Sequence, residues 1–153
     1  KAGVAKGTFY LYFKDKYDLL DRIVLNKSAQ VLCEAIKYNN LMEFDSFEDE
    51  LLSFVNYIIE YFKKDKLLLK LIYKDLSWGT FKKASNDYVE IRDIYKMFER
   101  EYKDHLSTED IQNLLFIIIE LTGSVCYSAI ILEEPGNIDE IKPVLFDTIR
   151  KII

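Results

Sequence analysis

The chain has 153 residues and a formal net charge of −5, with 50% apolar and 31% charged residues, which suits one domain that buries a core and stays soluble. Only five glycines and two prolines are present, and this shortage of turn formers excludes a sandwich or barrel of many short strands. One histidine and two cysteines are too few for a four-ligand zinc site, so we expect no metal, no cofactor and a reducing, cytoplasmic setting.

The charge is uneven along the chain. Residues 1–16 hold four lysines against Asp15, which gives +4 − 1 = +3, and the remainder therefore carries −5 − 3 = −8. A basic end on an acidic body indicates that an anionic partner would meet the N-terminus. The first predicted element is a short helix within residues 4–13, entered by a turn at Gly3, which can adopt a positive φ.

Residues 2–20, AGVAKGTFYLYFKDKYDLL, resemble the second half of the helix-turn-helix of TetR-family (tetracycline-repressor-type) transcriptional regulators. In that family a turn of the form A-G-V leads into a recognition helix of the form S-K-G-T-x-Y-x-Y-F, followed by K-x-K-x-x-L-L. Ala5 replaces the commoner serine. The resemblance implies that DNA is contacted by Lys6, Gly7, Thr8, Tyr10, Tyr12 and Lys16. Amide groups and the dipole at a helix N-terminus attract phosphate, which agrees with this assignment.

The resemblance also predicts the domain organisation. Residues 1–16 correspond to the C-terminal part of the DNA-binding domain, whose preceding helices are absent, and residues 17–153 to a helical regulatory domain. We therefore expect the chain alone to give no sequence-specific gel shift. A chain extended N-terminally by about 30–50 residues, the length of two typical helices with their connections, should give one.

The rest of the chain predicts helices separated by short turns, and hence an all-α fold. The first runs from Asp15 or Lys16 to about Asn40; Ser46 and Asp65 then cap two more, the second covering Lys66–Leu76. The remaining helices are expected over residues 81–105, 107–132 and 138–153. Expected inward-facing residues include Leu20, Ile23, Val89, Ile91, Ile94, Tyr95, Phe98 and Tyr102.

The helix over residues 107–132 is apolar on almost every side. A membrane span is possible by length, but the polar residues along it favour a buried helix and no membrane. Because one chain of this size cannot cover such a helix, we expect residues 107–153 to form a four-helix bundle in a homodimer. The alternative is an ordinary core helix of a monomer.

Family resemblance implies a small-molecule effector, and the aromatic residues suggest an aromatic or cationic one. The candidate pocket residues are Tyr57, Tyr61, Trp78, Tyr95, Phe116, Glu120 and Tyr127. The alternative for each aromatic ring among them is plain core packing, which aromatic residues more often provide. Glu120 lies in a run of isoleucines, and a buried carboxylate needs a partner, either a cationic effector or a lysine or arginine at an interface.

The predicted function is that of a ligand-responsive bacterial regulator, a repressor released from double-stranded operator DNA by its effector. An enzyme is not expected, because no HExxH, GxSxG, P-loop or GxGxxG motif is present and His105 has no evident nucleophile partner. The alternative is a non-DNA-binding helical module that binds small molecules or serves as a scaffold.

Overall fold

The computed structural model describes residues 14–75, 79, 82 and 86–153. Within these residues every regular element is a helix, which confirms the all-α prediction. The elements are α2 (Lys16–Asn39), α3 (Phe47–Lys64), α4 (Lys66–Asp75), α6 (Val89–Tyr102), α7 (Thr108–Cys126), the π-helix η1 (Tyr127–Leu132) and α8 (Ile138–Ile152).

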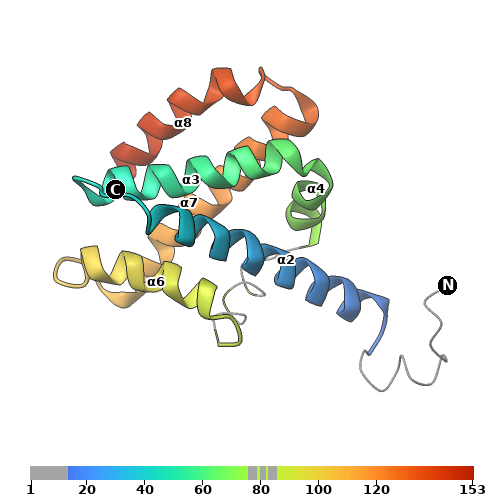
Figure 1. Cartoon of the computed structure of the whole chain (residues 1–153), viewed down its shortest axis with the longest axis horizontal. Coiled ribbons are helices and arrows are strands. Elements are labelled where there is room, and N and C mark those ends of the chain that lie inside the picture. Colours follow the sequence, from blue (N-terminus) through green and yellow to red (C-terminus); the bar gives the residue numbers. More distant parts are fainter. Residues whose placement is uncertain (1–13, 76–78, 80–81, 83–85) are drawn as a thin grey trace.

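Helix α3 lies at the centre of the body and contacts α2, α4, α7 and α8 (Figure 1). Helix α6 packs on α2 and α7, and α8 lies on the opposite side of α3 from α2 and α6. The largest fully buried side chains come from several of these helices: Leu51, Ile59, Leu69, Ile91, Phe98, Leu115 and Ile149. One continuous apolar core therefore joins the helices that surround α3.

Three helix starts follow from their capping residues, as the sequence predicts. Asp15 Oδ1 accepts hydrogen bonds from the amides of Tyr17 and Asp18, at 2.7 and 2.9 Å. The Ser46 and Ser107 hydroxyl oxygens each accept one from the amide three residues on, both at 3.1 Å. Such caps satisfy amides that have no partner inside the helix.

Two expectations about the helices are wrong. The helix expected from residue 81 to residue 105 is not continuous: Lys82 is helical, but Asn86 and Asp87, which favour turns, form one, and α6 begins after it at Val89. Val89 and Ile23, both expected inside, are 47% and 46% exposed. Val89 is the first residue of its helix and Ile23 lies in the N-terminal third of α2, where the described part of the chain provides little cover.

The helix expected over residues 107–132 is present, but its last six residues form the π-helix η1. Two of its large apolar side chains are half exposed: Ile117 at 50% and Leu132 at 52%. Residues Thr108–Leu132 are long and apolar enough to cross a membrane, judged by length and composition alone, and only 33% of the most apolar window is buried. The single chain therefore leaves much of this helix uncovered.

Helix α8 is held to α3 by a network of ion pairs. Lys142 Nζ lies 2.6 Å from Glu60 Oε1, and Lys63 Nζ lies 2.8 Å from Asp139 Oδ1. The hydrogen bond from Lys142 is the main reason why the pKa of Glu60 is lowered. The bond from Lys63 likewise lowers the pKa of Asp139. The last helix is thus fixed in place by charge as well as by Leu145 and Ile149.

Candidate ligand cavity and DNA-binding segment

An apolar cavity of about 150 Å³ lies inside the helical body. Five helices provide its wall, and most of the side chains that face it are aliphatic or phenylalanine. The lining residues are Ser28, Val31, Leu32, Leu51, Phe54, Val55, Ile58, Phe62, Ile72, Ile94, Met97, Phe98, Leu115, Ile118, Ile119, Thr122 and Gly123. A concave apolar site with few polar groups is the usual form of a small-molecule site.

Among the described lining residues, two carry a polar side chain, and in both the polar group is a hydroxyl. Ser28 Oγ donates a hydrogen bond to the Val24 carbonyl oxygen at 2.8 Å, one turn earlier on α2. Thr122 is 8% exposed, and its hydroxyl has no hydrogen-bond partner among the described residues. A buried polar group without a partner is costly, so Thr122 marks a place where a ligand could bond.

Gly123 follows Thr122 on α7 and leaves the wall open. A Cβ placed on Gly123 would meet nothing within 4 Å. The absence of a side chain at this position therefore leaves space that a larger residue would occupy.

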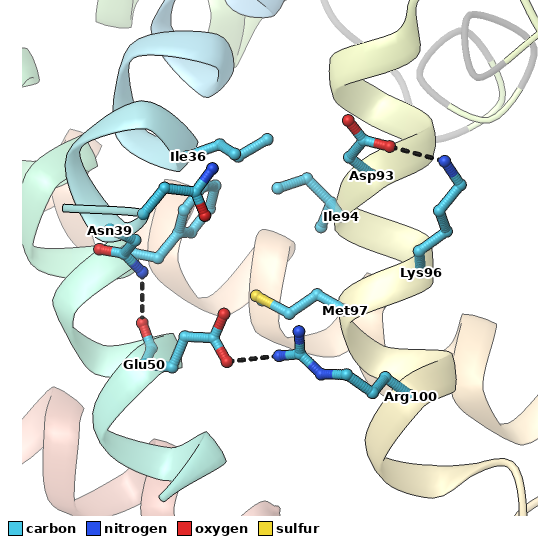
Figure 2. Close-up of a pocket in the computed structure, with 10 residues that line it drawn as sticks. Ile36, Asn39, Glu50, Asp93, Ile94, Lys96, Met97 and Arg100 are labelled. Atoms are coloured by element: carbon cyan, nitrogen blue, oxygen red, sulfur yellow. Dashed lines mark hydrogen bonds and ion pairs between the residues drawn. The ribbon is translucent and has the colours of Figure 1, made fainter. Parts of the chain in front are cut away.

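A second hollow, a polar groove of about 450 Å³, opens between α2, α3 and α6 (Figure 2). Figure 2 shows Arg100 reaching from α6 to Glu50 on α3, across the groove. Asp93 and Lys96, both on α6, form a second ion pair at 2.8 Å. The groove and the cavity share three lining residues, Phe54, Ile94 and Met97, so these side chains separate a charged outer hollow from an apolar inner one.

The residues predicted to form an aromatic pocket lie elsewhere. Six of the seven are described, and none of them lines the cavity or the groove: Tyr57, Tyr61, Tyr95, Phe116, Glu120 and Tyr127. Trp78 lies outside the described residues. Sequence reasoning favoured large aromatic rings, whereas the cavity is built mainly from aliphatic residues that the sequence identifies only as core.

Two of the predicted tyrosines, Tyr57 and Tyr127, have structural neighbours instead. The Tyr57 hydroxyl lies 3.4 Å from Glu34 Oε2, and burial, followed by the charge of Glu34, raises the pKa of Tyr57. Tyr127 of η1 stacks on Tyr73 of α4, with ring centroids 4.1 Å apart and an angle of 11° between the rings. This stack joins the π-helix to α4.

Glu120 is exposed, so the premise that its carboxylate is buried is wrong for the single chain. It lies on the same side of α7 as Phe116 and Ile117, which are 36% and 50% exposed. Water solvates an exposed carboxylate, and the physical reason for expecting a cationic effector at Glu120 therefore disappears. The alternative, a charge on an interface between chains, agrees with this position.

Of the predicted DNA-binding residues, only Lys16 is described. It is the first residue of α2 and exposed, and its Nζ lies 5.0 Å from the centroid of the Tyr17 ring. Lys6, Gly7, Thr8, Tyr10 and Tyr12 lie outside the described residues. Helix α2 thus begins directly after the proposed DNA-reading segment and continues to the cavity wall at Ser28.

Residues 1–23 match the model of the family described as bacterial regulatory proteins, tetR family. The match covers 23 of the 153 residues, at the N-terminal end of the chain. The matched residues include the whole of the segment on which the resemblance rests, and the all-helical body agrees with it. No curated protein and no solved structure gives a significant match to the chain. The match supports a TetR-family DNA-binding transcriptional regulator.

Proposed function

We propose that this TetR regulator is a homodimeric repressor that leaves its operator when a small molecule occupies the apolar cavity. The observation that carries the proposal is the course of α2. This helix starts within the family match, at Lys16, and supplies Ser28, Val31 and Leu32 to the cavity wall. A ligand in the cavity therefore touches the helix that carries the DNA-reading segment.

Regulation then follows from linkage between the two sites. The ligand is proposed to bind best when α2 holds the two DNA-reading segments of the dimer at a separation that does not fit the operator. The ligand then lowers the affinity for DNA, and DNA lowers the affinity for the ligand by the same factor. Two recognition helices must enter major grooves about one helical turn apart, so a small change of separation costs much affinity. In this proposal Lys6, Gly7, Thr8, Tyr10, Tyr12 and Lys16 contact the DNA.

The uncovered sides of α7 and α8 support the homodimer. Ile117 and Leu132 are half exposed, and Val144 of α8 is 65% exposed. Helices α7 and α8 contact each other, so two copies would bring four helices together and cover these side chains. A dimer also explains the apolar length of Thr108–Leu132 without a membrane, and we propose a bacterial cytoplasmic protein on this basis.

The proposal is tested with the natural protein that contains this chain. Its preferred DNA sequence is selected from a random double-stranded pool, and binding is followed by fluorescence anisotropy with and without cavity ligands. We expect a two-fold symmetric site bound by two copies, and release of the DNA by ligand. A protein that selects no DNA sequence would instead support the alternative, a helical module that binds small molecules without DNA.

A further inference from the structure

We propose that the cavity takes an uncharged, ring-sized molecule that carries one hydroxyl group, such as a simple phenol, with the hydroxyl bonded to Thr122. The inference rests on the proposed function only in taking the same cavity as the ligand site, and it adds the chemical class of the ligand. It follows from three observations on the cavity wall: its volume, its lack of charge and its single unpartnered hydroxyl.

The volume sets the size of the ligand. A cavity of about 150 Å³ lined by leucine, isoleucine and phenylalanine stays dry and binds benzene. The cavity described above has about this volume and the same kind of wall, in which Phe54, Phe62 and Phe98 accompany leucines and isoleucines. One six-membered ring with a small substituent therefore fits, and a fused polycyclic drug does not unless the helices move apart.

The lack of charge decides against both cations and anions. None of the described residues that line the cavity is ionisable. An ammonium or carboxylate group placed there would lose its hydration without gaining a partner. The charged residues of the neighbouring groove already form the pairs Glu50–Arg100 and Asp93–Lys96. The cavity wall therefore does not suit the cationic effector that the sequence suggested.

Thr122 decides the position of the polar group. Its side-chain oxygen is buried, the residue is 8% exposed, and no partner is present in the described part of the chain. A hydroxyl can both donate and accept, so a ligand hydroxyl satisfies Thr122 whichever way its hydrogen turns. Ser28 already donates to the Val24 carbonyl, and its oxygen can still accept. A ligand with one hydroxyl leaves fewer buried polar groups unsatisfied than a pure hydrocarbon does.

The experiment is calorimetric titration of the chain, without DNA, with four probes of nearly equal size: phenol, toluene, benzylammonium and benzoate. We expect phenol and toluene to bind, and both charged probes to bind at least tenfold more weakly than phenol. Equal or tighter binding of either charged probe would overturn the inference, because it would show a charge partner at the site.

Thr122→Val tests the bond itself, because valine has nearly the same shape and lacks the hydroxyl. In this variant the phenol hydroxyl is left without its partner, which weakens phenol binding by about 5- to 100-fold. Toluene binding should stay the same or become tighter. The ratio of the two dissociation constants should therefore change at least fivefold. An unchanged ratio would overturn the assignment of Thr122.

Gly123→Leu tests whether the probes occupy this cavity, because its side chain fills the space next to Thr122. We expect it to abolish binding of phenol and toluene. Arg92→Leu is the matched control: it adds the same side chain on an exposed position of α6 that does not line the cavity. If Gly123→Leu fails to fold, Gly123→Ala adds a single methyl group and should weaken toluene binding measurably. Binding unaffected by either change at Gly123 would place the probes elsewhere and overturn the inference.

The inference and the proposed function fail in different ways. If phenol binds as described but DNA affinity does not respond, the regulatory role of the cavity is wrong and the ligand class stands. If another molecule releases the DNA and phenol does not bind, the ligand class is wrong and the regulatory role stands.

Discussion

Replacing Gly123 by alanine should make the protein more stable. Gly123 lies inside α7. Glycine in a helix costs about 0.8–1.0 kcal/mol relative to alanine, because a glycine loses more backbone freedom on folding. Its backbone has no positive φ, and a new Cβ meets nothing within 4 Å, so no steric penalty opposes this gain. A methyl group inside the cavity adds up to about 0.8 kcal/mol of apolar burial.

We therefore expect the free energy of unfolding to rise by about 1–2 kcal/mol. For a chain of this size each kcal/mol shifts Tm by roughly 2–4 °C, which predicts an increase of about 2–8 °C. The assay is thermal unfolding followed by circular dichroism, at one fixed protein concentration because a dimer's Tm depends on it.

Gly136→Ala is the control for this prediction. Gly136 lies in the turn between η1 and α8, outside any helix, and a Cβ there would be 2.7 Å from Glu140 Oε2. It should gain less than Gly123→Ala. A lower Tm for Gly123→Ala would refute the reasoning, since it would mean that the space beside Gly123 is filled by packing that the single chain does not show.

Three further predictions concern the interface, the pH dependence and the thiols. Ile117 is 50% exposed in the single chain, so Ile117→Lys removes about 0.75–1.5 kcal/mol of interface burial in each of two copies, and light scattering should show a dimer weakened by roughly 10-fold or more. The pKa of Glu60 is lowered in the folded state, so its contribution to stability is present above about pH 4.5 and is lost as the pH falls through the pKa of the folded state. Lys142→Met should therefore remove up to about 1 kcal/mol of stability at pH 7. It should also flatten the loss of stability at acid pH, measured by urea unfolding from pH 3 to 7. Burial raises the pKa of Cys126 to about 12, so a maleimide should label Cys126 only after unfolding, and mass spectrometry showing rapid native labelling there would contradict the structure.

The helices were predictable because their signals are local. Asp15, Ser46 and Ser107 each stand just before an apolar pattern of helical spacing, and each is a cap in the structure. The π-helix at Tyr127–Leu132 has no such signal, because the residues of η1 suit an α-helix equally well. The turn at Asn86 and Asp87 has a local signal, because both residue types favour turns. The apolar residues at helical spacing across residues 81–105 nevertheless led to the prediction of one continuous helix.

The family match at the N-terminus was predictable for a different reason: residues 2–20 follow the order of residue types in the TetR helix-turn-helix. A glycine, lysines and tyrosines in a fixed order cannot be explained by core packing alone. The cavity was not predictable, because its wall uses the same leucines and isoleucines as any core. Thr122 is one hydroxyl in an apolar helix, and only the packing of five helices shows that its oxygen is buried with no hydrogen-bond partner in the described part of the chain.

The most direct test measures DNA affinity while the cavity is filled. Fluorescence anisotropy of the natural protein on its selected operator is recorded during a titration with phenol, alongside the Gly123→Leu variant. We predict that phenol lowers the affinity of the unmodified protein for DNA and leaves that of the variant unchanged. Equal affinity with and without phenol, at concentrations where calorimetry shows the cavity to be occupied, would contradict the link between cavity and DNA.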